Sequence, residues 1–349
     1  MTSASRVFVG AGQFTAGSRS GIFRRVDDGP WQQMTKGLPE PVQVMAITPH
    51  PGDRDVVYIG TNDGPYRSVD GGDRWERLPF PEPGLQVWSI LVDPSSPRRL
   101  YAGTSPLGVF RSDDGGDHWR RLPNAVQPER VKMPFACRVM RLAADAARPE
   151  TLWAAVEVGG VMRSDDAGDT WNDCSGHLVK LAELPHLKSR IVSDTDIEGM
   201  LDVHALAVSP AEPGTVFLAL RMGLFRSDDG GRSWQDLEVG RFSPLTYGRD
   251  IRVSPHDAHT LLACLSPAAR SEDGSLYRSQ DLGRTWSRFD HGVKAHSTMM
   301  GLALHPRDAG RAYGVSRTGQ VFGTEDAGGS WREDRLPDGV LDVYAIACA

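Results

Sequence analysis

Cysteine is scarce in this chain of 349 residues, and the four cysteines lie far apart. No C-x-x-C pair is present, so the spacing fits neither a zinc ribbon nor a framework of disulfides. Reduced thiols in a cytoplasmic protein are therefore expected. The four positions are Cys137, Cys174, Cys264 and Cys348.

An excess of positive charge is also missing. Lys and Arg number 39 against 45 Asp and Glu, which gives a formal net charge of −6, and no basic tail is present. Nucleic acid is therefore not expected as a partner. No apolar run approaches the roughly 18 residues of a membrane span, and Met1–Arg6 lacks the pattern of a secretory leader. The sequence predicts no membrane partner and a cytoplasmic location.

Several catalytic sequence motifs are absent as well. The chain has no G-x-S-x-G elbow, no G-x-x-x-x-G-K-[ST] loop and no dinucleotide fingerprint between a strand and a helix. What it does have is glycine, with 38 residues, and tryptophan, with nine. This composition predicts many turns and a recurrent use of tryptophan.

A repeat accounts for most of the tryptophans. The segment from Ser68 to Trp75, SVDGGDRW, returns as SDDGGDHW from Ser112 to Trp119 and in four later copies, with a shortened copy ending at Trp31. Asp and Gly suit a tight turn, and Trp suits the start of the strand that follows. The intervals between markers run from 44 to 63 residues, as expected for one four-stranded sheet per repeat. The marker tryptophans are Trp31, Trp75, Trp119, Trp171, Trp234, Trp286 and Trp331.

The S/T-x-D-x-G-x-x-W unit resembles the Asp-box, or BNR repeat, of sialidases, sortilin ectodomains and photosystem II assembly factors. The resemblance covers nearly the whole chain. It implies an all-β, seven-bladed propeller with four antiparallel strands per blade, formed by residues 1–349 as a single domain. It also implies that the repeated turn joins the third and fourth strands of a blade, on the face away from the active site.

The two ends of the chain predict how the ring closes. Residues Arg6–Gly10 align with the second strand of a blade, whereas Val340–Ile346 align with a first strand. The C-terminal strand should therefore complete the N-terminal sheet and hide its edge.

Aligned positions at the start of each first strand are expected to line the mouth of the central channel. Unlike the repeated turns, these positions differ from blade to blade and mix charges with aromatic rings, as expected of a ligand site. The outer column is Gln43, Gln86, Arg138, Asp202, Tyr247, Thr298 and Asp342. The inner column is Met45, Trp88, Met140, His204, Arg249, Met300 and Tyr344.

One insertion, at 172–200, leads directly into this mouth. It connects a fourth strand to a first strand and carries apolar residues such as Leu178 and Leu187. Long connections in compact domains are usually functional or disordered. The sequence predicts a lid with a short helix, which would bring His186 and Arg190 to the substrate.

Arginine is the most specific feature of the predicted mouth. Arg138, Arg221, Arg249 and Arg317 come from four blades, and Arg190 joins them from the predicted lid. Guanidinium groups bind carboxylate or phosphate through paired hydrogen bonds. These arginines and His186 are therefore predicted to bind a small anionic molecule. Pairing with Glu157, Asp202 or Asp342 is the alternative.

No metal motif is present, and no cofactor is predicted. His186, His204 and His296, with a nearby carboxylate, leave a divalent metal as an open alternative. No H-x-H or H-E-x-x-H spacing supports it.

The leading functional hypothesis is a hydrolase or lyase that acts on a small anionic compound in the central funnel. His204 would serve as general acid or base. Glu157 or Asp202 would orient it or act as the second acid or base.

Two alternatives stay open. One is a scaffold without catalysis that binds a protein or peptide. The other is a glycoside hydrolase similar to sialidases, in which Tyr344 or Tyr247 with Glu157 would imitate the sialidase nucleophile. The Phe/Tyr-Arg-Ile-Pro motif of sialidases is missing, because Arg190-Ile191 follows Ser189.

Overall fold

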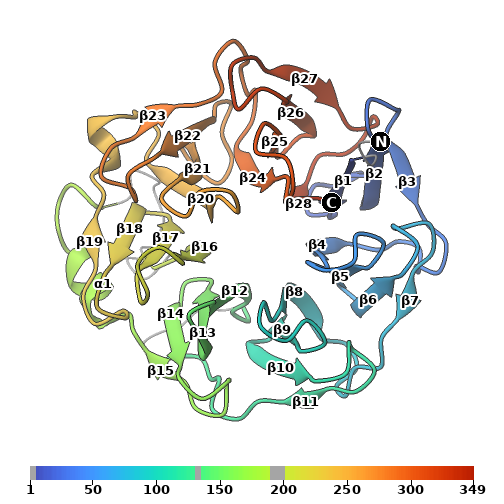
Figure 1. The fold of residues 1–349 in the computed structure, drawn as a ribbon, viewed down its shortest axis with the longest axis horizontal. Helices are drawn as coiled ribbons and strands as arrows, with labels where there is room; N and C mark the ends of the chain where they lie inside the picture. The colour runs from blue at the N-terminus through green and yellow to red at the C-terminus, as the bar shows by residue number, and fades with distance from the viewer. Residues whose placement is uncertain (1–4, 130–134, 189–200) are drawn as a thin grey trace.

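Seven four-stranded antiparallel sheets surround a central channel, as Figure 1 shows, and the predicted fold class is confirmed. The computed structural model describes residues 5–129, 135–188 and 201–349. The first strand of each blade lies at the channel and the fourth at the outer edge. The first three blades in chain order comprise β1 (Arg6–Ala11), β2 (Gly21–Val26) and β3 (Gln32–Met34); β4 (Val44–Pro49), β5 (Val57–Thr61), β6 (Gly64–Ser68) and β7 (Glu76–Arg77); and β8 (Gln86–Val92), β9 (Leu100–Ser105), β10 (Gly108–Ser112) and β11 (Arg120–Arg121).

The remaining blades follow the same order. They comprise β12 (Val139–Asp145), β13 (Arg148–Val156), β14 (Gly160–Ser164) and β15 (Asn172–Asp173); β16 (Val203–Val208), β17 (Val216–Leu220), β18 (Gly223–Ser227) and β19 (Gln235–Asp236); β20 (Tyr247–Val253), β21 (Leu261–Ser266), β22 (Ser275–Ser279) and β23 (Ser287–Arg288); and β24 (Met299–Leu304), β25 (Ala312–Ser316), β26 (Gln320–Thr324) and β27 (Arg332–Arg335).

The last strand closes the ring as predicted. β28 (Val343–Cys348) pairs with β1, so that the first blade has the order β28-β1-β2-β3. Just past the end of β28, Ala349 exchanges two backbone hydrogen bonds of 2.9 Å each with Arg6, the first residue of β1. β1 thus has a neighbour on both sides, and its edge is covered.

The repeated turn joins the third and fourth strands and is held by its own side chains. In the copy after β14, the Gly168 backbone N–H donates to the Ser164 hydroxyl at 2.8 Å, and Ser164 donates to Asp166 at 2.8 Å. Asp166 also accepts the backbone N–H and the hydroxyl of Thr170 at 2.8 and 2.7 Å. These hydrogen bonds favour the carboxylate and lower the pKa of Asp166. The turn chemistry is therefore structural.

The core lies between neighbouring blades. One cluster combines Tyr101 and Val109 of one blade with Leu152 and Met162 of the next, and all four are at most 8% exposed. Since each sheet buries its faces against both neighbours, the ring is stabilised by apolar contacts all the way round.

The insertion at 172–200 begins with β15, the fourth strand of its blade, and continues into the short helix α1 (Gly176–Leu181), so the predicted helix is present. Leu178 and Leu187 are buried in a cluster with Trp234, and the Trp234 backbone N–H donates to His177 Nδ1 at 2.8 Å. Figure 1 shows α1 at the outer edge of the ring, beside β19. The described part of the insertion therefore packs against the rim and does not cover the channel. Residues 189–200 lie outside the described residues.

A second short helix, the 3-10 turn η1 (Val239–Arg241), precedes β20. Among the described residues, neither helix approaches the length and apolar content needed to cross a membrane.

Candidate functional site

The inner column of aligned residues lines the central cavity. This cavity, of about 70 Å³, is bordered by all seven positions that the alignment places there. They are Met45, Trp88, Met140, His204, Arg249, Met300 and Tyr344.

A β-bulge explains why these side chains face the channel. In every blade the pairing of the first strand with the second skips one residue, and that residue is the member of the inner column. In β16, for example, Val203 and Ala205 pair with successive residues of β17, and His204 is left out. A bulge redirects a side chain from the face of the sheet. Here the seven bulges aim seven different side chains at one axis.

Arg138 and Glu157 form an ion pair beside the cavity. The Arg138 Nε and Glu157 Oε2 atoms are 3.1 Å apart, and both side chains are largely buried. The Arg138 guanidinium also lies 4.2 Å from the ring centre of Trp88 and 5.7 Å from that of Phe14. One cation therefore joins the carboxyl group to an aromatic cluster.

The aromatic cluster consists of Phe14, Trp88 and Tyr344. The Tyr344 ring meets Phe14 at 5.8 Å and Trp88 at 5.4 Å between ring centres, in edge-on geometry. Phe14 is 55% exposed, which is unusual for so large an apolar side chain. The cluster therefore presents an apolar surface to solvent at the mouth of the channel.

Among the carboxyl groups at this site, Glu157 has the pKa with the largest upward shift. Burial raises its pKa, the Asp202 charge raises it further, and Arg138 and Arg249 offset only part of this, so that the pKa of Glu157 reaches about 7. A carboxyl group with this pKa is half protonated near neutrality. Glu157 can therefore hold a proton where an ordinary glutamate cannot.

The pKa of Asp202 shifts in the opposite direction. Burial raises the pKa of this carboxyl group, but the charges of His204, Arg249 and Arg221 outweigh burial and hold the pKa of Asp202 below its usual value. The pKa values of these two neighbouring carboxyl groups are thus shifted in opposite directions. Glu157 favours the protonated acid, and Asp202 favours the carboxylate. Such a division is typical of sites for acid–base chemistry.

His204 is buried, and both of its ring nitrogens have hydrogen-bond partners. Nδ1 lies 2.7 Å from the Gly248 carbonyl oxygen, which requires Nδ1 to carry a proton. Nε2 lies 2.8 Å from the Tyr247 hydroxyl and 3.2 Å from Asp202. A neutral His204 therefore accepts from Tyr247, and a charged one donates to Asp202. The ring orients these two groups, and its predicted acid–base role stays a prediction.

The three other predicted arginines of the described residues also interact with carboxylates. Arg317 donates to Asp342 at 2.7 Å, and Asp342 further accepts the backbone N–H and the hydroxyl of Thr15. The charges of Arg221 and Arg249 act on Asp202. The structure therefore brings Arg138, Arg317 and their carboxylates together in pairs, which was the alternative to a free cluster of arginines.

Two buried polar atoms at the mouth, Asp202 Oδ1 and the Tyr344 hydroxyl, have no hydrogen-bond partner among the described residues. Glu157 Oε2 is in contact with the Arg138 guanidinium through the ion pair of 3.1 Å. A buried polar atom without a partner costs free energy, on the order of 1–3 kcal/mol. The two atoms without a partner are therefore the natural contacts for a ligand.

The remaining predicted residues lie elsewhere. His186 is 3.4 Å from Asp236 of β19, the outermost strand of its blade, so it stands at the rim and not at the channel. Its side chain is 63% exposed. His296 is exposed in the loop before β24. Arg190 lies outside the described residues. Within the described ranges no three His, Cys, Asp or Glu side chains gather as a metal site, and the four cysteines are free.

Phe14 was missed, and Trp88 and Tyr247 were not assigned roles in the leading hypothesis. The alignment placed Trp88 and Tyr247 at the mouth, and only their contacts with Arg138 and His204 reveal their importance. Phe14 lies in the loop after β1, where no other blade offers an aligned aromatic residue to signal it.

Known proteins similar to this chain include a probable oligoxyloglucan-reducing end-specific xyloglucanase of Neosartorya fischeri. It is 23% identical over 252 residues, which are 67% of this chain and 28% of that protein. The chain thus spans less than a third of the length of the curated relatives it matches. No family model matches the chain.

Solved structures share the propeller fold. An ancestral GH74 enzyme superposes with a TM-score of 0.62 at 16% identity, covering 92% of this chain and 40% of that one. YCF48 bound to a D1 peptide superposes with a TM-score of 0.55 at 16% identity, covering 88% of this chain and 85% of that one. These similarities establish the fold.

Proposed function

We propose that the chain is a glycoside hydrolase of the propeller class that takes a neutral glycan at the mouth of its channel. Glu157 acts as the general acid and protonates the leaving oxygen, and Asp202 acts as the carboxylate that activates water or attacks the sugar. The observation that carries the proposal is that the pKa values of these two neighbouring carboxyl groups are shifted in opposite directions. Glycosidases generally use one protonated and one ionised carboxyl group in this way.

The surrounding residues support this division of roles. Burial keeps the proton on Glu157, while Arg138 limits the rise of its pKa. His204 and Arg249 hold Asp202 ionised. Since Tyr247 and the Gly248 carbonyl fix the ring of His204, the negative charge of Asp202 has a fixed partner.

The aromatic cluster supports a sugar ligand. Phe14, Trp88 and Tyr344 offer apolar rings against which the C–H face of a sugar packs, beside polar atoms for its hydroxyl groups. An anionic substrate is less favoured, since Arg138 and Arg317 already pair with Glu157 and Asp342. The curated relatives that match the chain are named as xyloglucanases, which supports a β-glucan as the glycan.

The test is hydrolysis of xyloglucan oligosaccharides, cello-oligosaccharides and a nitrophenyl β-cellobioside. Glu157→Gln should lower kcat/KM on natural oligosaccharides by about 10²–10⁴-fold and far less on the nitrophenyl substrate, whose leaving group needs no acid. Asp202→Asn should lower both equally. Wild-type activity should fall above pH 7, as Glu157 loses its proton.

Glu150→Gln is the matched control, because Glu150 is exposed near the start of β13, whereas Glu157 directly follows the end of that strand. It should leave kcat/KM unchanged. The proposal is wrong if the wild type hydrolyses none of these substrates, or if Glu157→Gln, folded to the wild-type melting temperature, keeps full activity.

A second candidate function rests on the extent of one structural match. YCF48 bound to a D1 peptide is covered over 85% of its length, whereas the ancestral GH74 enzyme is covered over 40%. A peptide scaffold would use the same exposed cluster around Phe14. Saturable peptide binding that Phe14→Ala abolishes, with no glycan hydrolysis, would favour this function.

A further inference from the structure

An arginine on the third strand connects most blades to the next one. In five blades it donates from Nη1 to a backbone carbonyl of the repeated turn of the following blade, always at the third residue after the Ser or Thr of that turn. The pairs are Arg24 with Gly71 (2.7 Å), Arg67 with Gly115 (3.1 Å), Arg163 with Gly230 (2.9 Å), Arg226 with Leu282 (2.8 Å) and Arg278 with Ala327 (3.2 Å).

In two of these blades the arginine makes two further contacts within its own blade. Arg163 pairs across the strands with Trp153, and its guanidinium lies 5.4 Å from the ring centre. Arg226 stands in the same relation to Phe217, at 5.6 Å. Each also binds the Asp two residues later, Arg163 to Asp165 at 2.5 Å and Arg226 to Asp228 at 2.6 Å. A ring, a carboxylate and a carbonyl thus surround the guanidinium groups of Arg163 and Arg226.

The seventh blade lacks this arginine. Gly323 occupies the position on β26, and it pairs with Tyr313 on β25 as Arg163 pairs with Trp153. A Cβ built on Gly323 would lie 3.2 Å from the Tyr313 ring, so this face of the ring meets no side chain from the neighbouring strand position. The carboxylate two residues later is present as Glu325. The binding partners of the arginine therefore remain although the arginine is gone.

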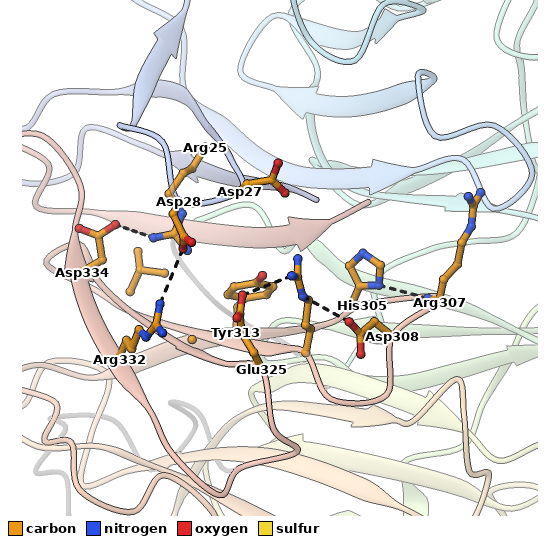
Figure 2. Close-up of a pocket in the computed structure, with 13 residues that line it drawn as sticks. Arg25, Asp27, Asp28, His305, Arg307, Asp308, Tyr313, Glu325, Arg332 and Asp334 are labelled. Carbon is orange, nitrogen blue, oxygen red and sulfur yellow. Dashed lines mark hydrogen bonds and ion pairs between the residues drawn. The ribbon is translucent and has the colours of Figure 1, made fainter. Parts of the chain in front are cut away.

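A pocket of about 520 Å³ lies at this seam, between the seventh blade and the first. Figure 2 shows Tyr313 and Glu325 on one side of it and Asp27 and Asp28, which follow β2, on the other. Gly323 forms part of the wall. The missing side chain thus coincides with a cavity.

The charges around the pocket favour a cation. Arg25 is bound to Asp334 at 2.6 Å, and Arg311 is shared by Asp308 and Glu325 at 3.3 and 3.4 Å. Arg332 reaches Asp28 only at 3.9 Å. Of the ionisable residues in the wall, five are Asp or Glu and four are Arg, and burial lowers the pKa of the one histidine, His305. The wall therefore carries a net negative charge at neutral pH.

We propose that this pocket binds the guanidinium group of an arginine side chain presented by a partner polypeptide. The incoming group takes the place of the arginine that the seventh blade lacks. It stacks on Tyr313 and pairs with Glu325, while Asp27 and Asp28 of the first blade supply the acceptors that the turn carbonyl supplies at other seams. A planar guanidinium meets a ring face and a carboxylate at once, which an ammonium group does less well.

The experiment is calorimetric titration of the full chain with N-acetyl-arginine amide at low salt. N-acetyl-lysine amide and the uncharged N-acetyl-citrulline amide serve as matched ligands. Saturable binding is expected for the arginine compound, with at least tenfold weaker binding for the other two. Glu325→Gln should weaken binding of the arginine compound several-fold.

Gly323→Arg supplies the missing side chain from within. It should lower the affinity for N-acetyl-arginine amide at least tenfold and raise the melting temperature, whereas Gly323→Ala should bind within threefold of wild type. The proposal is overturned if the wild type shows no saturable binding at tens of millimolar, if citrulline binds equally, or if Gly323→Arg and Glu325→Gln both bind as wild type. Tighter binding of phosphate than of the arginine compound would also overturn it.

Discussion

Carboxyl groups of the repeated turns and of the channel mouth have opposite surroundings. Asp166 in a turn accepts hydrogen bonds from Ser164 and Thr170, which lower its pKa. Glu157 at the mouth is paired with Arg138, and burial raises its pKa to about 7.

This difference distinguishes positions that carry the same residue type in most blades from positions whose residue changes from blade to blade. The carboxyl group of the repeated turn accepts hydrogen bonds within its own turn, so its charge stabilises the fold. At the mouth, Asp202 Oδ1 and the Tyr344 hydroxyl are buried without a hydrogen-bond partner among the described residues, at a cost in stability that a ligand can recover. Gly323 shows the same principle at the seams, since the one blade that departs from the repeated arginine is the one beside the pocket.

The largest effect expected on stability comes from removing the mouth carboxyl. The folded pKa of Glu157 is about 7 against 4.5 for the free group, so its contribution is fully present below pH 4.5 and is lost as the pH rises through 7. Glu157→Gln cannot ionise. Its free energy of unfolding, relative to wild type, should therefore rise between pH 4.5 and pH 8 by about 3 kcal/mol. Urea unfolding of both proteins at the two pH values measures this.

Contributions of the turn aspartates cancel in that difference, because both proteins contain them. A relative stability that stays constant, or falls, between the two pH values would contradict the raised pKa. Glu150→Gln should show no such trend.

A smaller loss of stability is expected when an arginine that joins two neighbouring blades is removed. Arg163→Ala removes the hydrogen bond to Gly230, the ion pair with Asp165 and the stacking on Trp153. We expect the free energy of unfolding to fall by about 2 kcal/mol, whereas filling the seventh seam by Gly323→Arg should change it in the opposite direction. Chemical unfolding of the two variants compares the seams directly, and equal signs would contradict the comparison.

The smallest effect is expected in a single turn. Asp166→Ala should lower the free energy of unfolding by about 1 kcal/mol at neutral pH, because the backbone N–H and hydroxyl of Thr170 lose their acceptor. Since the pKa of Asp166 is lowered in the fold, the difference from wild type should shrink as the pH falls through that pKa. Glycan hydrolysis should not change, and a loss of activity would contradict the structural role of the turn.

The fold was predictable because its signals are local and repeated. The tryptophan markers give the number of blades, the aligned first strands give the residues around the cavity, and Val340–Ile346 indicates the closing strand. The bulge that aims the inner column at the channel recurs at the same alignment position in each blade. Because the pattern repeats, aligning one position across the blades was enough to predict the residue that each of the seven blades places at the channel.

The site was less predictable because pairing depends on contacts between blades. The alignment brought Arg138 and Glu157 to the mouth, but not to each other. The position of His186 was misjudged because a connection between a fourth and a first strand can pack outwards, and buried Leu178 and Leu187 hold this one at the rim. Gly323 was overlooked as well. The signal was in the sequence, since Phe322-Gly323 stands where Phe225-Arg226 stands in another blade.

The closing strand has a consequence for how the protein is made. β28 carries Tyr344 to the channel mouth, and Asp342, just before it, holds Arg317. Of the strands in this ring β28 is the last in chain order, so the mouth lacks Tyr344 until this strand has been synthesised and has paired with β1. The proposed ligand site is therefore complete only when the ring is closed, and a nascent chain whose other blades have formed still lacks it.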